Sequence, residues 1–205
     1  MALAVGLAIV PAWFLVRQVR AGRSDAVAWA AACIGGAIFA AFALRQARAA
    51  ILRPLLVCLA TAGIAGSALM VLSTLIRVGG ASFWSARPAV LLPIFAQRLF
   101  LFMPACFVVE EVTFRGALDA HVHHAGEERG LGSALFVSAL WGLWHLPITT
   151  SSAPWPARAV SLIAVHSVIG IPLSLGWRRS GNLMVPAVAH AVIDAIRDAL
   201  VIGIR

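Results

Sequence analysis

Long apolar runs recur along nearly the whole sequence, and only short clusters of arginine or proline interrupt them. A helix that crosses a bilayer needs about 20 mostly apolar residues, because lipid offers its backbone no hydrogen-bond partners. The composition agrees, since 61% of the residues are hydrophobic, 12% are charged and the mean hydropathy is +0.94. Soluble domains rarely have such values. The sequence therefore predicts an all-α integral membrane protein.

We identify six to seven candidate transmembrane helices, at residues 2–16, 26–44, 54–76, 88–109, 131–146, 157–176 and 183–203. The first run is short for a full span. It also lacks the basic start and the cleavage site of a signal peptide, so we interpret it as a membrane helix. No linker, charge run or internal repeat divides the chain, which favours a single polytopic helical bundle over residues 1–205.

The basic residues are sixteen arginines, which with eight acidic residues give a net charge of +8. A nucleic-acid-binding protein would carry such charges on one face, interleaved with aromatic residues. Here the arginines cluster at the ends of predicted spans, as at Arg45, Arg48 and Arg53, where lipid headgroups attract them. We therefore expect the lipid bilayer as a partner and no nucleic acid. Alternate loops share the arginines almost evenly, so the charges favour neither orientation.

The cysteines Cys33, Cys58 and Cys106 lie in separate apolar segments and form no CxxC pair. Neither a disulfide framework nor a thiolate zinc site is indicated by this spacing. We interpret all three as small packing residues.

Two adjacent glutamates follow an apolar run in the stretch CFVVEEVTFRGALDAHVHH, residues 106–124. An ionisable group at membrane depth costs at least about 2.5 kcal/mol, so it persists where it faces a partner in the protein interior. Glu111 and Arg115 have the i, i+4 spacing of an ion pair on one helix face. Glu110 lies about 100° away around the helix and is left available for chemistry. On this segment alone, solvation of these residues among headgroups is an equal alternative.

Two further apolar helices carry polar residues at helical spacing. WGLWHL places Trp141 four residues before His145, and VPAVAHAVIDAIRDAL places His190 four residues before Asp194. Because each of these histidines has a companion on its own face, we expect both to meet the glutamates in the bundle interior. His166 has no such companion, and we interpret it as a hydrogen-bonded interior histidine.

Together these segments resemble the CAAX prenyl endopeptidase and bacteriocin-processing (CPBP) family of intramembrane proteases. EEVTFR matches the family motif EExxxR, WGLWH matches FxxxH, and HAVID matches Hxxx(N/D), in the same order. The resemblance covers about residues 88–203, which implies a catalytic core there, and residues 1–87 are then variable N-terminal helices. Trp141 occupies the position of the phenylalanine in the motif. The substitution keeps an aromatic side chain at the site but makes it larger.

The resemblance implies an endopeptidase that hydrolyses a peptide bond of a membrane-anchored or prenylated substrate, in a multi-pass protein of a bacterial cell membrane. It implies that Glu110 and His145 activate the attacking water. It also implies that Glu111 and Arg115 support the site. A carboxylate and an imidazole suit this chemistry, because peptide hydrolysis needs a deprotonated water and a stabilised oxyanion.

For His190 and Asp194 the resemblance implies binding of the oxyanion or of a metal. Some members of the family carry asparagine at the position of Asp194, and an ionised aspartate cannot donate a hydrogen bond to an oxyanion. Carboxylate and imidazole both bind zinc, so a divalent metal becomes more attractive here. The ligands we expect for it are His145, His190, Asp194 and Glu110.

Two other classes of function stay open. A small transporter would use buried carboxylates and histidines as a relay, but it would also predict inverted repeats, and we find none. A catalytically silent immunity or scaffold protein would keep the helical core, although every motif position here carries a chemically competent residue. A soluble-type zinc protease and a serine hydrolase are disfavoured, because the sequence has neither HExxH nor GxSxG.

Overall fold

The computed structural model describes residues 51–204, apart from 81–82, 84–86, 124–125, 127–129, 148 and 150–151. Its elements are helices, and no strand occurs among the residues described, as the sequence predicts. The predicted helices at 2–16 and 26–44 lie outside this part of the chain. Two helices in it are long and apolar enough to cross a membrane, Leu52–Val78 and Trp155–Ser180.

The first described helix is continuous and contains α3 (Leu52–Cys58), the π-helical turn η1 (Leu59–Gly63) and α4 (Ile64–Val78). It corresponds to the predicted span at 54–76.

The second helix begins with α6 (Pro88–Ala105), where a proline in the first turn costs no hydrogen bond. It continues as the π-helical segment η2 (Cys106–Asp119) and as α7 (Ala120–Val122). This helix therefore extends well past residue 109, the predicted end of the span.

Three more helices follow, α8 (Leu131–Trp144), α9 (Trp155–Ser180) and α10 (Met184–Gly203). Their positions agree with the predicted spans to within a few residues. Gly181 ends α9 with a φ of 61°, a left-handed conformation that favours glycine and lets the chain turn at once into α10.

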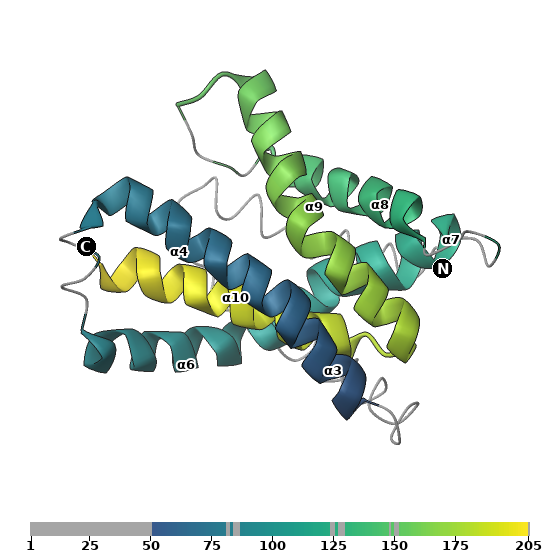
Figure 1. The fold of residues 1–205 in the computed structure, drawn as a ribbon, viewed down its shortest axis with the longest axis horizontal. Helices are drawn as coiled ribbons and strands as arrows, with labels where there is room; N and C mark the ends of the chain where they lie inside the picture. Colours follow the sequence, from purple (N-terminus) through teal and green to yellow (C-terminus); the bar gives the residue numbers. More distant parts are fainter. Residues whose placement is uncertain are drawn as a thin grey trace.

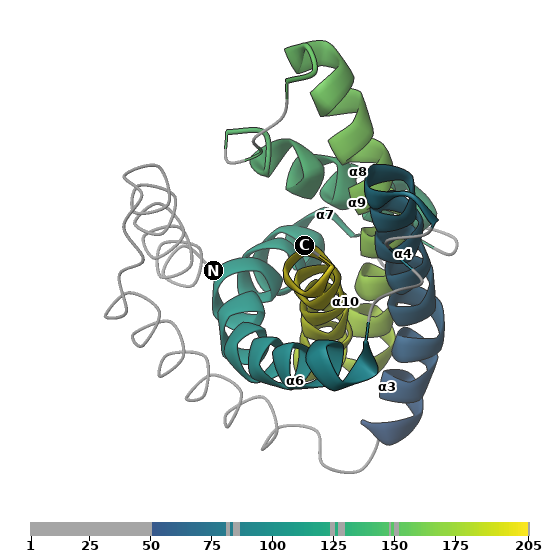
Figure 2. The same ribbon diagram turned by 90° about the vertical axis from the view of Figure 1, so that its left-hand side faces the viewer.

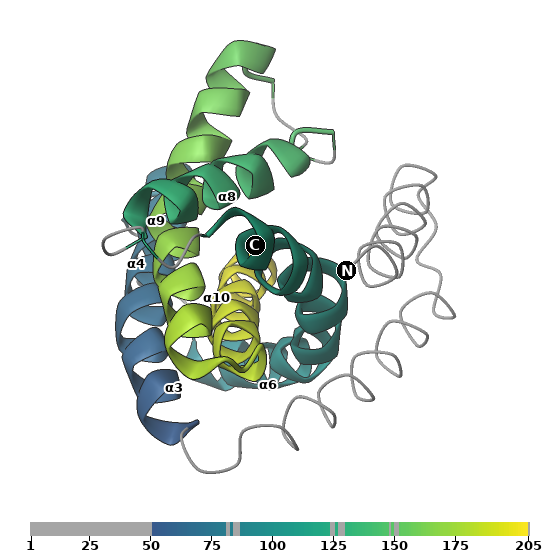
Figure 3. The ribbon, with the colours of Figure 1, turned by 90° about the vertical axis from the view of Figure 1, so that its right-hand side faces the viewer.

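Helix α10 lies in the middle of the bundle. It contacts α3, α4, α6, α9 and both π-helical segments. Figure 2 and Figure 3, which view the molecule from opposite sides, both show α10 enclosed by its neighbours. Helices α8 and α9 pack against each other beside this group (Figure 1). The largest side chains of the shared core include Trp141, Leu173 and Val185.

A glycine allows α8 and α9 to cross closely. A Cβ atom at Gly142 would lie 2.6 Å from the carbonyl oxygen of Leu162, so only a residue without a side chain fits there. Small residues at such crossings are typical of membrane helices, which associate through close backbone packing. The crossing places His145, just after α8, beside His166 of α9, with ring centroids 4.3 Å apart.

Charged side chains lie inside the bundle, and large apolar side chains lie on its outside. Glu111, Arg115 and Asp119 have no exposed surface, whereas Phe100 is 85% exposed and Ile76 is 77% exposed. Water would disfavour so many exposed apolar side chains, but lipid does not. The surface is therefore typical of helices that face a bilayer.

Candidate active site

Glu110 lies in η2, where the wider π-helical turn is a geometry often found at functional sites. Its Oε2 atom accepts a hydrogen bond of 2.5 Å from Trp141 Nε1, which comes from α8. The same oxygen is 3.7 Å from His145 Nε2 and 3.8 Å from His190 Nε2. One oxygen of Glu110 therefore faces three side chains from two other segments of the bundle.

Glu111 is fully buried, and one of its carboxylate oxygens contacts two partners. Its Oε1 atom is 3.2 Å from Arg115 Nη1 and 2.8 Å from His190 Nδ1. The predicted ion pair with Arg115 is confirmed, within a π-helical rather than an α-helical segment. The guanidinium of Arg115 also lies over the ring of Trp141, 4.3 Å from its centroid, a favourable cation–π contact. Glu111 therefore links the helix that carries the glutamates to α10.

The hydrogen-bond partners fix the orientation of two histidine rings. His190 Nδ1 faces the Glu111 carboxylate, and His145 Nδ1 is 2.9 Å from the carbonyl oxygen of Trp141. Both partners only accept, so each Nδ1 carries a hydrogen. Both Nε2 atoms face Glu110, which is itself an acceptor. At these distances a proton, a water molecule or a cation could bridge the carboxylate and the imidazole nitrogens.

Asp194 turns its two oxygens in different directions. Its Oδ1 atom accepts a hydrogen bond of 2.7 Å from Arg197 Nη1. Its Oδ2 atom is 3.6 Å from His190 Nε2 and 3.6 Å from the Sγ atom of Cys106. Arg197 is itself held by Asp198, at 3.1 Å from both Nε and Nη2. Arg197 therefore fixes one oxygen of Asp194 and leaves the other directed at the histidine.

Four side chains could hold a metal ion. The ligand atoms of Cys106, Glu110, His190 and Asp194 all lie within 4.8 Å of one another. Thiolate, imidazole and carboxylate are the ligands that zinc prefers, so the donor set fits a divalent metal. The carboxylate on Nδ1 of His190 is also the usual outer partner of a metal-binding histidine.

Three of the four predicted metal ligands belong to this group, and His145 lies outside it. The cysteine was predicted to be a packing residue, and it is buried as expected. Its proximity to Asp194 was not predicted. The sequence feature that could have placed Cys106 at the site is its position four residues before Glu110.

His166 was interpreted as a hydrogen-bonded interior histidine, and its Nδ1 indeed lies 2.7 Å from the carbonyl oxygen of Leu162. The structure also places its ring 4.5 Å from the ring of Trp141. His166 therefore borders the candidate site. No sequence motif contains it, and only the crossing of α8 and α9 brings it there.

A buried ion pair fixes the end of η2. Asp119 accepts two hydrogen bonds from Arg178 of α9, at 2.9 Å from Nε and at 2.5 Å from Nη2. Arg178 also donates to the carbonyl oxygen of Gly130 and to the hydroxyl of Ser133, at the start of α8. One guanidinium therefore ties together three helices that carry or support the site. The sequence analysis did not identify this pair.

These contacts connect all six predicted site residues, Glu110, Glu111, Arg115, His145, His190 and Asp194. Their side chains come from η2, α10 and the residue that follows α8. The predicted convergence of three helices is confirmed. The chemical roles of the residues stay predictions.

A family model described as Type II CAAX prenyl endopeptidase Rce1-like matches residues 90–196. The matched segment is just over half of the chain and contains the whole connected group of site residues. No curated protein and no solved structure gives a significant match.

Proposed function

This chain belongs to the Type II CAAX prenyl endopeptidase Rce1-like family, and we propose that it is an intramembrane endopeptidase. Its substrate is a membrane-anchored or prenylated protein or peptide. We further propose a polytopic bundle of six to seven spans in a bacterial cell membrane, with the catalytic core over residues 88–203. The apolar outer surface of the described helices supports this location.

The observation that carries the proposal is the convergence on Glu110. Its carboxylate faces the Nε2 atoms of two histidines inside a helical bundle. Carboxylate and imidazole are both able to accept a proton from a water molecule, as general base catalysis requires. Trp141 fixes the orientation of the carboxylate through its indole N–H. In this proposal Glu110 takes the proton from water, and His145 shares it.

In the same proposal, His190 and Asp194 stabilise the oxyanion. Glu111, braced by Arg115, holds the imidazole of His190 so that Nε2 faces the site. When protonated, this Nε2 can donate a hydrogen bond to the oxyanion that forms at the substrate carbonyl. The Oδ2 atom of Asp194 stabilises that protonated ring, while Arg197 keeps the aspartate in place.

As an alternative role for the same residues, we propose that a divalent metal, with zinc the best fit, binds at this position, and that Glu110 and His190 are then ligands in place of general base and oxyanion donor. Glu110, His190, Asp194 and Cys106 would hold it. When bound, the ion polarises a carbonyl and makes a coordinated water more acidic. Glu111 would then keep the hydrogen of His190 on Nδ1 by accepting a hydrogen bond from it, which leaves Nε2 available to the metal.

A cleavage assay on the purified protein tests the proposed activity. The substrates are membrane-anchored peptides with and without a prenyl group. Glu110→Gln should lower kcat by about 100-fold or more, because general base catalysis contributes that much, while the protein stays folded. Arg77→Gln is the matched control, since Arg77 is exposed and far along the sequence from the site. Equal activity of wild type and Glu110→Gln would exclude this role, and a wild type that cleaves none of the peptides would favour a silent protein.

A further inference from the structure

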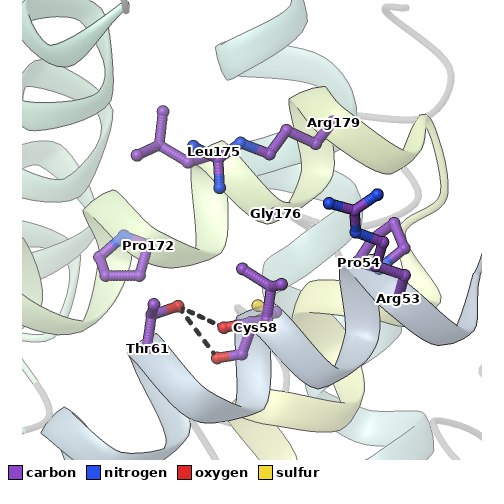
Figure 4. A pocket seen from close by; sticks show the side chains of 9 residues that line it. Arg53, Pro54, Cys58, Thr61, Pro172, Leu175, Gly176 and Arg179 are labelled. Carbon is purple, nitrogen blue, oxygen red and sulfur yellow. Dashed lines mark hydrogen bonds between the residues drawn. The ribbon is translucent and has the colours of Figure 1, made fainter.

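A cavity of about 470 Å³ lies between α3 and α9 (Figure 4). Pockets that bind small molecules typically have about 300–1,000 Å³, so this cavity is large enough for a ligand. It contains none of the six predicted site residues, and its lining residues are Arg53, Pro54, Val57, Cys58, Thr61, Pro172, Leu175, Gly176 and Arg179.

The two arginines of the cavity come from neighbouring helix ends. Arg53 is near the start of α3 and Arg179 is near the end of α9, so both lie where a headgroup region is expected. Both are exposed, and neither forms a hydrogen bond or ion pair with another described residue. Arg178, the adjacent residue, is in contrast held by Asp119. The arginines of the cavity are therefore available to an external anion.

The rest of the lining is largely apolar. Pro172 and Thr61 lie at one end of the cavity in Figure 4, and the backbones of the two arginines lie toward the other. The hydroxyl of Thr61 donates within its own helix, to the carbonyl oxygens of Val57 at 2.8 Å and Cys58 at 3.3 Å. It therefore offers no free donor to a ligand. The cavity therefore combines two cationic side chains with a largely apolar wall.

We propose that this cavity binds an anionic phospholipid, independently of proteolysis. The phosphate lies between Arg53 and Arg179, because guanidinium groups bind phosphate oxygens in pairs. One acyl chain follows the apolar wall formed by Val57, Pro172 and Leu175. A free phosphate would leave that wall unused. Basic pockets between membrane helices are known to favour anionic headgroups.

Native mass spectrometry of the full chain in detergent tests the proposal. The probes are phosphatidylglycerol, phosphatidylcholine and inorganic phosphate. We expect phosphatidylglycerol to bind most tightly. Each of Arg53→Gln and Arg179→Gln should weaken it about fivefold, because a basic residue near the surface contributes that much to binding an anionic lipid. Arg77→Gln is the matched control, because Arg77 is also exposed but lies outside the cavity.

Val57→Trp provides a second test that leaves both arginines intact. The indole would occupy space along the apolar wall, so phosphatidylglycerol should bind more weakly while the binding of inorganic phosphate is unaffected. Equal binding of both phospholipids would overturn the proposal, as would arginine variants that bind phosphatidylglycerol like Arg77→Gln. Inorganic phosphate that displaces phosphatidylglycerol at equal concentration would show an anion site alone and would also overturn it.

Discussion

Glu110 and Glu111 are adjacent in sequence but have different surroundings. Glu111 is fully buried against Arg115 and His190, whereas the side chain of Glu110 is 14% exposed and faces His145 and His190. A carboxylate with two buried partners has a structural task. A carboxylate that faces the Nε2 atoms of two imidazoles is suited to proton transfer. The environment separates two residues whose side chains are identical.

Glu111→Gln should lower the free energy of unfolding by about 3–5 kcal/mol. The substitution removes the carboxylate from a buried ion pair and leaves the charge of Arg115 without its counterion. Two further nitrogens of Arg115, Nε and Nη2, already have no hydrogen-bond partner among the described residues. Thermal unfolding in detergent measures the effect, with Glu110→Gln as the matched control. If both variants unfold at the same temperature, Glu111 does not have this structural role.

Asp194→Asn should lower the affinity for zinc at least about tenfold, because a neutral amide is a poorer ligand than a carboxylate. Metal analysis of the purified protein should find zinc, a chelator should abolish cleavage, and added zinc should restore it. Cys106→Ser should also weaken zinc binding if the thiolate is a ligand. Activity that withstands the chelator, together with an active Asp194→Asn variant, would instead support a metal-free glutamate and histidine pair.

At the scale of elements, the crossing of α8 and α9 determines where His145 lies. Gly142→Ala should lower the free energy of unfolding by about 1–3 kcal/mol, because the new methyl group would meet the backbone of Leu162. It should also reduce cleavage, since the helices must separate and carry His145 away from Glu110. Gly80→Ala is the control, because a Cβ atom there meets nothing within 4 Å. Equal stability of the two variants would show that the crossing tolerates a side chain.

At the scale of the whole molecule, Arg178 joins three helices around the site. Arg178→Gln should destabilise the bundle by about 3–5 kcal/mol, because it leaves the buried carboxylate of Asp119 without its cation. Arg77→Gln removes the same charge from an exposed position and should change stability by less than about 0.5 kcal/mol. Denaturant unfolding of both variants measures the difference. Similar denaturation midpoints for the two variants would mean that the ion pair between Arg178 and Asp119 contributes little to the stability of the fold.

The sequence alone determined the helical class and much of the local geometry. Apolar runs predicted the described helices because a membrane helix must satisfy its own backbone. The i, i+4 spacing brought Glu111 to Arg115 and His190 to Asp194, since residues four apart meet on one helical face. The π-helical form of η2 was not predicted, because no local pattern in that segment distinguishes it from an α-helix.

Contacts between helices were decided only by the tertiary structure. Trp141 reaches Glu110, His190 reaches Glu111, and Cys106 reaches Asp194 across separations of 31, 79 and 88 residues. Local hydrogen bonds fix which residues share a helix face, but not the angle or depth at which two helices cross. Those depend on packing at positions such as Gly142, where the absence of one side chain lets two backbones meet.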